Sequence, residues 1–184
     1  MIVQEKDLEK CLSILKSGGI VIYPTDTIYG IGCSIEFEDS VKKIYQIKQR
    51  GENHPLPVAF SSLKQAREYT MLSKEQESII KKAIKSKEPF TFIVKKNGKI
   101  SKSISKEDTV GMRILDNKIA RELTGAVGPI ITTSANIHGK SPAAEFKDLD
   151  PEIIKRVDMV IEGECKSKKP SKIVNLLNGE ILRA

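Results

Sequence analysis

The sequence predicts a single α/β domain in which helices pack against a mixed β-sheet. Helical and strand-like patterns alternate along all 184 residues, and the strand-like apolar runs are short. Asn178-Gly179, near the end of the chain, is a strong hairpin signal that requires some antiparallel pairing. This length suits one compact unit, so we expect one domain over residues 1–184.

The first half of the chain carries three helix signals and three strand signals. Leucines at helical spacing precede Gly18-Gly19, which ends the first helix. Ser73 is a good N-cap, and Gln76 three residues later completes a capping box. The patterns predict helices at 5–17, 38–49 and 73–85, and strands at 20–23, 56–60 and 90–95.

The second half continues the alternation. Asp116 is expected to cap a short helix that ends at Gly125, and Asp150-Pro151 opens another that runs to about Arg156. Strands are predicted at 109–115, 129–133, 159–161 and 173–177, and the last pairs with 180–183 through the Asn-Gly turn.

The charge is unevenly distributed along the chain. The net charge is +7, yet residues 41–106 contain 16 Lys and Arg against 5 Asp and Glu. Nine lysines and one acid, Glu88, lie between Lys81 and Lys106. This stretch is either a solubilising surface or a surface for a polyanion such as RNA or nucleotide phosphates.

Several classes of protein are excluded by composition. No apolar run approaches the ~20 residues of a membrane span, and the N-terminus lacks a signal-peptide core, so we expect a cytoplasmic protein without a membrane partner. Three scattered cysteines and two histidines support neither a disulfide framework nor a zinc site. We identify no metal ligands among the side chains.

Two familiar nucleotide motifs fail on inspection. Gly30-Ile-Gly32 begins like a dinucleotide fingerprint, but Ile35 stands where the third glycine belongs. Gly139-Lys140-Ser141 ends like a phosphate loop, but Ser134 replaces its first glycine. Neither motif supports a nucleotide site.

Polar clusters stand instead where predicted strands and helices end. Pro24–Gly30 follows the first strand and is read either as an ordinary turn or as part of a site. Lys48-x-Arg50 ends a helix, where cations also complement the dipole. Residues 132–136 (Thr-Thr-Ser-Ala-Asn) leave a buried strand, a place where α/β sheets bind ligands. Cations, hydroxyls and an amide suit phosphate binding and orientation of reactants more than acid–base catalysis.

Taken together, these segments resemble the YrdC family of threonylcarbamoyl-adenylate synthases. The resemblance covers most of the chain, and the joint order of the motifs makes it specific. The matching segments are Pro24–Gly30, Lys48-x-Arg50, Pro55-Leu56, Pro89-x-Thr91, Val110–Arg113, Pro129–Asn136 with Gly139, and Ser171-x-Ile173-Val174.

The resemblance implies a fold, a reaction and partners. The fold is an open twisted α/β sheet with a basic concave face, of the kind that binds double-stranded RNA. The reaction joins L-threonine, bicarbonate or CO₂, and ATP into threonylcarbamoyl-AMP, a nucleotidyltransferase reaction that releases pyrophosphate and uses Mg²⁺. A downstream tRNA threonylcarbamoyl transferase complex consumes the product for N6-threonylcarbamoyladenosine at tRNA position 37. Direct binding of tRNA or double-stranded RNA is a further expectation.

The resemblance also implies roles for ten residues. Lys48 and Arg50 are expected at the ATP phosphates as the catalytic cations, because Lys supplies a point charge and Arg a planar fork. Arg113 is expected to hold the threonine carboxylate. The nucleotide set is Lys48, Arg50, Ser134, Asn136 and Arg183, and the threonine set is Thr25, Tyr29, Thr91, Arg113 and Ser171.

The chain departs from the family pattern at several positions. These are Gly51, His54, Glu88, Leu115 and Lys172. Lys172 could add a phosphate contact or reach solvent, and we favour solvent. Two other functions stay open: an RNA-binding module without catalysis, which would show salt-dependent RNA affinity and no pyrophosphate release, and a carbamoyl-adenylate enzyme like the domain in hydrogenase maturation proteins, which would not prefer threonine.

Overall fold

The computed structural model describes residues 1–4 and 7–184, so the first two residues of the predicted helix 5–17 lie outside the described part. The chain alternates between strands and helices, as expected. The elements are β1 (Ile2–Gln4), α1 (Leu8–Lys16), β2 (Val21–Tyr23), β3 (Gly30–Gly32), α2 (Glu38–Lys48), β4 (Val58–Phe60), α3 (Leu63–Arg67), β5 (Thr70–Met71), α4 (Lys74–Ser86), β6 (Phe90–Lys96), β7 (Thr109–Ile114), α5 (Lys118–Val127), β8 (Ile130–Ile131), β9 (Thr133–Ser134), the 3₁₀ turn η2 (Phe146–Asp148), α6 (Pro151–Ile154), β10 (Met159–Glu162), β11 (Lys172–Asn175) and β12 (Ile181–Arg183).

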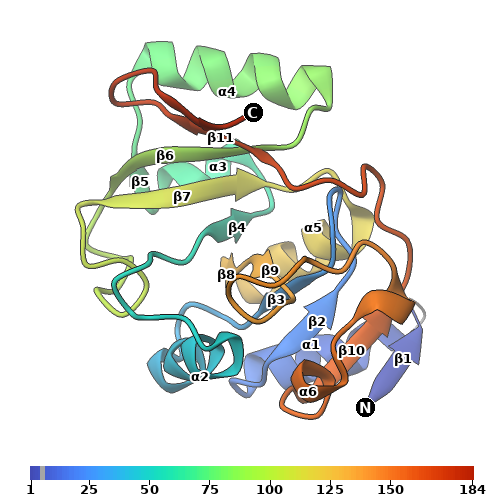
Figure 1. Ribbon diagram of the computed structural model, residues 1–184. Coiled ribbons are helices and arrows are strands. Elements are labelled where there is room, and N and C mark those ends of the chain that lie inside the picture. The colour runs from blue at the N-terminus through green and yellow to red at the C-terminus, as the bar shows by residue number, and fades with distance from the viewer. Residues whose placement is uncertain (5–6) are drawn as a thin grey trace.

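The strands form two mixed sheets rather than the one sheet that the sequence suggested. The first has the order β1-β10-β2-β3-β9, with parallel pairs at β1–β10 and β10–β2 and antiparallel pairs beyond. The second has the order β12-β11-β6-β7-β4-β8, and the short strand β5 pairs antiparallel with the last two residues of β6. Figure 1 shows the second sheet above the first, with the link from β10 to β11 running between them at one side.

The two sheets are joined because the predicted strand 129–133 divides into two. β8 pairs with β4 in one sheet and β9 with β3 in the other. A Cβ added to Gly32 would lie 2.0 Å from the carbonyl oxygen of Ile131. Only glycine permits this approach of β8 to β3, so Gly32 fixes how closely the sheets meet.

The buried hydrophobic side chains form two clusters, and each includes residues from strands of both sheets. The smaller cluster also takes residues from α1 and α5, and its largest buried side chains include Leu15, Tyr23 and Leu123. The larger cluster lies under α2 and α4 and contains Ile44, Phe60 and Ile80. Among the described residues, no helix is both long and apolar enough to cross a membrane.

Local capping signals were read correctly at two helices and wrongly at one. The Ser73 capping box of α4 and the Asp150 cap of α6 are both present. The predicted cap Asp116 is wrong, because Asn117 Oδ1 accepts the backbone N–H of Ala120 at 3.1 Å instead. The carboxylate of Asp116 instead forms an ion pair with Arg121. Helix α5 therefore starts one residue later than predicted, with Asn117 as its N-cap.

Short elements without clear periodicity were not predicted. They are β1, β3, α3, β5 and η2. β3 has the sequence Gly-Ile-Gly, which has low intrinsic strand propensity and forms a strand because β2 and β9 pair with it on both sides. Tertiary pairing therefore overrides the local signal at the position next to the cavity.

Candidate functional site

A cavity of about 480 Å³ opens between the two sheets. β3 and β9 of the first sheet and β6, β7, β11 and β12 of the second all contribute side chains to it. Of the ten residues predicted for the site, Lys48 lies outside the lining, and the other nine line the wall: Thr25, Tyr29, Arg50, Thr91, Arg113, Ser134, Asn136, Ser171 and Arg183. The fold therefore gathers the predicted residues from distant parts of the chain.

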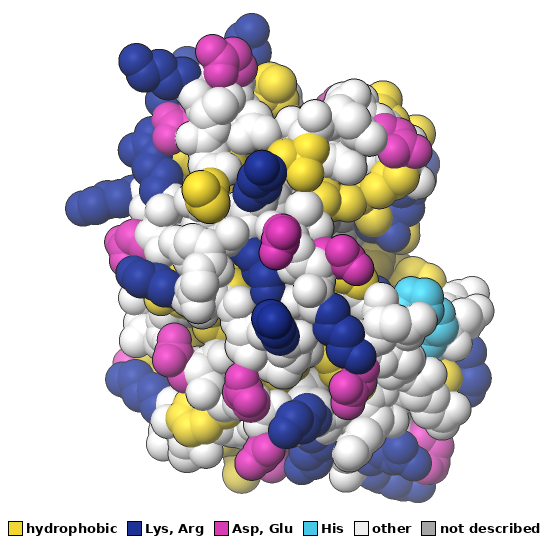
Figure 2. All heavy atoms as spheres, turned by 90° about the vertical axis from the view of Figure 1, so that its left-hand side faces the viewer, with side chains coloured by type: hydrophobic (Ala, Val, Ile, Leu, Met, Phe, Trp, Pro, Cys, Tyr) yellow, Lys and Arg dark blue, Asp and Glu magenta, His cyan; other side chains and the backbone are white. Residues whose placement is uncertain are grey.

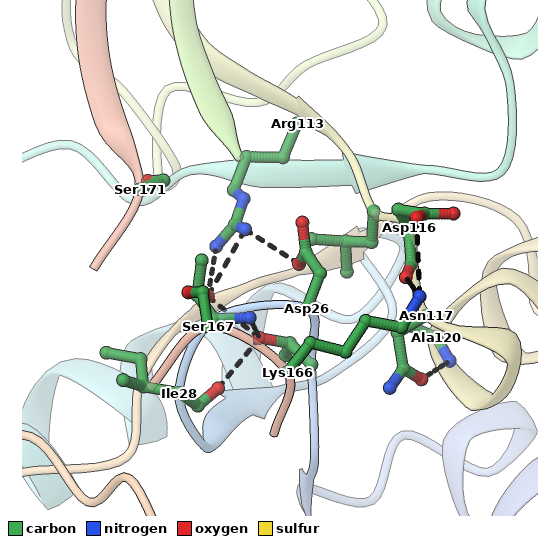
Figure 3. A network of polar contacts seen from close by, with 12 residues as sticks. Asp26, Ile28, Arg113, Asp116, Asn117, Ala120, Lys166, Ser167 and Ser171 are labelled. Carbon is green, nitrogen blue, oxygen red and sulfur yellow. Dashed lines mark hydrogen bonds and ion pairs between the residues drawn. The ribbon is translucent and has the colours of Figure 1, made fainter. Parts of the chain in front are cut away.

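Arg113 projects from β7 into the gap between the sheets, where it meets the turn that follows β2. Its Nη2 donates to Asp26 Oδ1 at 2.9 Å, and both Nη atoms lie 3.3 Å from Thr27 Oγ1 (Figure 3). Arg113 is 8% exposed and Asp26 is 7% exposed, and the Nε of Arg113 has no hydrogen-bond partner among the residues that the structure describes. The predicted carboxylate-binding group is thus already held on one side by a buried carboxylate.

Arg183, on the last strand, closes a second part of the wall. Its Nε donates to the carbonyl oxygen of Ser171 at 2.7 Å, and its Nη2 lies 3.2 Å from the Ser171 hydroxyl. That hydroxyl is 2.8 Å from the hydroxyl of Thr91. Arg183 was predicted with the nucleotide set, but its contacts belong to two residues of the predicted threonine set, and its nucleotide role stays a prediction.

The end of α2 and the segment after β9 form a third part of the site. Lys48 is 2% exposed, and its ammonium donates to the carbonyl oxygen of Asn136 at 2.9 Å and to that of Ser134. Arg50 reaches the wall and donates to the carbonyl oxygen of Pro55 at 2.9 Å. The contact of Lys48 with ATP phosphates stays a prediction, since its ammonium points at the backbone behind the wall.

The turn at residues 24–30 is both a structural turn and a wall. The Thr25 hydroxyl lies 2.8 Å from that of Thr27 and donates to the carbonyl oxygen of Ile28. The buried Tyr29 hydroxyl donates to the carbonyl oxygen of Gly163 at 2.5 Å, so it ties the turn to the link between the sheets. The hydroxyls that cap the turn also border the cavity, and the role of this segment in a functional site stays a prediction.

The cavity lining is cationic, although Asp26 compensates the charge of Arg113 from behind the wall. In the described part of the chain, this lining contains Arg50, Arg113 and Arg183 and no carboxylate. Burial lowers the pKa of all three guanidinium groups, and Asp26 partly opposes this effect at Arg113. Depressed pKa values mean that the charges are poorly solvated, and a bound anion would relieve this cost.

Metal coordination by side chains finds no support among the described residues, where no group of three or more His, Cys, Asp or Glu is placed to hold an ion. The cavity wall instead offers guanidinium, hydroxyl and amide groups. This donor set fits phosphate and carboxylate oxygens.

Two of the family departures pair with each other. The Lys172 ammonium lies 3.1 Å from Glu88 Oε2 at the exposed start of β11, which agrees with the expectation that it reaches solvent. A third departure, His54, lies against His138, with the two rings tilted by 35° and their centroids 5.3 Å apart. Glu88, Lys172 and His54 therefore form their contacts at the protein surface, whereas Leu115 is buried in the smaller hydrophobic cluster.

Sequence reasoning missed Asp26 as a site residue. It treated Asp26 as a turn residue, whereas the carboxylate pairs with Arg113. The available signal was Arg113 itself, because an arginine inside an apolar strand needs a buried anionic partner.

Lysines and arginines do not form one continuous patch on the face seen in Figure 2. There, acidic side chains lie between the lysines and arginines of the described residues. Lys96, one of the nine lysines, donates to the carbonyl oxygens of Ile100 at 3.1 Å and Ser105 at 2.7 Å. It therefore supports a loop of the fold, and the expected basic concave face stays a prediction.

The two-sheet fold and its arginine-lined cavity define an α/β protein equipped to bind small anionic molecules. The family model that matches residues 13–184 is Sua5–YciO–YrdC, described as telomere recombination. The chain belongs to this family.

Relatives and solved structures agree with this assignment. A Methanocaldococcus jannaschii protein, provisionally named threonylcarbamoyl-AMP synthase, is 37% identical to this chain. The alignment covers 98% of this chain and 87% of that protein. Escherichia coli YciO, named as uncharacterized, is 30% identical over 94% and 85%. Sua5 from P. abyssi superimposes with a TM-score of 0.87 at 25% identity, covering 96% of this chain and 56% of its own. A second structure of that Sua5, complexed with L-threonine, has a TM-score of 0.84 at 23% identity and covers 96% and 54%. The chain thus spans just over half the length of Sua5.

Proposed function

We propose that this protein is a threonylcarbamoyl-AMP synthase. It converts L-threonine, bicarbonate or CO₂, and ATP into threonylcarbamoyl-AMP and pyrophosphate. The observation that carries the proposal is the cavity wall, which combines three arginines with hydroxyl and amide groups and suits a triphosphate and an amino acid together. The names of relatives and the threonine complex of Sua5 support the same reaction.

The reaction has two bond-forming steps in this scheme. The unprotonated amine of threonine attacks CO₂, which forms a C–N bond and, after loss of a proton, a carbamate. A carbamate oxygen then attacks the α-phosphorus of ATP, an O–P bond forms, and the bond to the leaving pyrophosphate breaks. The protein supplies proximity and positive charge where negative charge accumulates.

The residues divide between the two substrates. Arg50, Ser134 and Asn136 lie at one part of the wall and serve the nucleotide, with Arg50 at the phosphates. Arg113, together with Thr91, Ser171, Thr25 and Tyr29, serves threonine, and the Arg113 guanidinium holds the carboxylate. Arg183 lies next to Ser171 and faces both substrates. We propose that Mg²⁺ enters bound to the ATP phosphates, because the described side chains form no metal cluster.

The product is consumed elsewhere. We propose that a tRNA threonylcarbamoyl transferase complex uses it to form N6-threonylcarbamoyladenosine at tRNA position 37, and that the reaction takes place in the cytoplasm. Direct binding of tRNA or double-stranded RNA by this chain belongs to the same proposal.

The test is an omission experiment with the purified protein. Pyrophosphate release is measured with ATP, Mg²⁺, bicarbonate and threonine, and then with each component left out in turn. Release that needs both threonine and bicarbonate supports the proposal. Release that is indifferent to threonine excludes it, and carbamoyl phosphate replacing both would favour a carbamoyl-adenylate enzyme.

A further inference from the structure

Lys48 is buried behind the cavity wall, and its ammonium is fully occupied with acceptors from one segment. It donates to the backbone carbonyl oxygens of Ser134 and Asn136, and Asn136 Oδ1 lies 3.4 Å away. Charge-assisted hydrogen bonds are about twice as strong as neutral ones. The segment that follows β9 is therefore anchored to the last residue of α2 by a buried, charged donor.

The anchoring also runs in the opposite direction. The backbone N–H of His138 donates to the carbonyl oxygen of Lys48 at 2.7 Å. Within the segment, Asn136 Nδ2 donates to the carbonyl oxygens of Ile137 and Lys140. Residues 134–140 thus form a loop that is closed on itself and fastened to Lys48 at both its backbone and its side chain.

Lys48 and Arg50 face different ways, although they are two residues apart. Lys48 ends α2, and Gln49 then takes a left-handed conformation with φ of 50°. This turn brings Arg50 to the cavity wall and leaves Lys48 behind it. Ser134 and Asn136 have backbone oxygens bound by Lys48 and also line the cavity.

We propose that Lys48 is a positioning residue, which holds the 134–140 loop in the shape that presents Ser134 and Asn136 to the nucleotide. The identity of that nucleotide as ATP rests on the proposed function. In this arrangement Lys48 acts through the loop, and Arg50 is the cation that meets phosphate.

The charge state of Lys48 makes the arrangement sensitive to pH. Burial, together with the nearby Arg50 charge, lowers the pKa of Lys48 to about 7. Among the described residues, no acidic group contributes to this shift, and the imidazoles of His54 and His138 lie against each other at the exposed side of the same loops. As pH rises through about 7, the ammonium loses its proton and the loop loses a charged donor, so loop order decreases.

The test compares Lys48→Met and Lys48→Arg with Lys42→Met, an exposed position on the same helix. Hydrogen exchange is followed without ligand at the amides of Ala135, Asn136 and His138, which are hydrogen-bonded in the folded loop. ATP and AMP affinities are then measured by calorimetry between pH 6 and 9.

We expect exchange in Lys48→Met to accelerate by about tenfold or more at these amides and not elsewhere, the loss expected for a charged hydrogen bond. The affinities for ATP and AMP should fall by the same factor, because in the proposed arrangement the loop contacts the adenosine monophosphate part that both nucleotides share. Lys42→Met should match the unmodified protein. Between pH 6 and 9, the unmodified loop should loosen while Lys48→Arg, which stays charged, should not.

Two results would overturn the inference: unchanged loop exchange in Lys48→Met, or a loss of ATP affinity that leaves AMP affinity intact, since that loss marks a direct contact of Lys48 with the β- or γ-phosphate. If the unmodified protein bound neither nucleotide, the proposed function would fail, while the ligand-free exchange would still decide whether Lys48 holds the loop.

Discussion

Replacing Asp26 with alanine should strongly destabilise the protein. The carboxylate is the anionic partner of Arg113, with 2.9 Å between Oδ1 and Nη2, and both side chains are almost fully buried. Removing one member of a buried pair typically costs 3–5 kcal/mol. Because Arg113 borders the cavity, water can partly replace the carboxylate, and we expect about 3 kcal/mol.

Urea unfolding measures this loss. With a slope of about 2 kcal/mol per molar urea, the midpoint should fall by about 1.5 M. The control is Glu152→Ala, which removes the exposed ion pair with Lys155 and should barely move the midpoint. The double variant of Asp26→Ala and Arg113→Met should be more stable than Asp26→Ala alone, because no unpaired buried charge remains. An Asp26→Ala midpoint within 0.3 M of the unmodified protein, taking about 0.3 M as the error of the method, would refute the reasoning.

Three further outcomes follow from the contacts. Gly32→Ala places a methyl group 2.0 Å from a β8 carbonyl oxygen and should lower the thermal midpoint by about 10 °C or more. Ser171→Ala removes the hydroxyl that contacts Arg183 Nη2 and Thr91, while Arg183 keeps its bond to the Ser171 backbone carbonyl oxygen. The KM for threonine should rise about tenfold with a smaller change in kcat, measured by pyrophosphate release. Two lysines, one of them Lys168, lower the pKa of Glu145 to about 2. The ion pair between Glu145 and Lys168 should therefore be intact above pH 4.5 and be lost as the pH falls toward 2. Glu145→Gln should make residues 163–171 more susceptible to limited proteolysis at neutral pH.

The sequence predicted helix caps and turns correctly where the structure depends only on residues a few positions apart. The Ser73 capping box needs only neighbouring residues, and it was predicted correctly. The hairpin at Asn178-Gly179 and the cap at Asp150 belong to the same class. At Asp116 and Asn117, either side chain could cap α5, and the choice depends on Arg121 and Lys166, which bind Asp116 from outside the turn.

Features that depend on distant pairing were not predictable in this way. β3 has almost no strand signal, and the division of 129–133 between two sheets depends on the close approach at Gly32. The gathering of site residues came from the family resemblance, since spacing alone does not place Arg113 beside Asp26 or Arg183 beside Ser171. The directions in which Lys48 and Arg50 point could not be predicted from the sequence either. Both are cations at the end of one helix, and the left-handed conformation of Gln49 turns only Arg50 toward the cavity.

The most direct test of the proposed reaction is formation of the mixed anhydride itself. Isotopically labelled bicarbonate is incubated with the protein, MgATP and L-threonine, and the adenylate fraction is isolated. We predict that label enters an adenylate that also contains threonine, in amounts equal to the pyrophosphate released. An adenylate without label, or label incorporation that does not require threonine, would contradict the account.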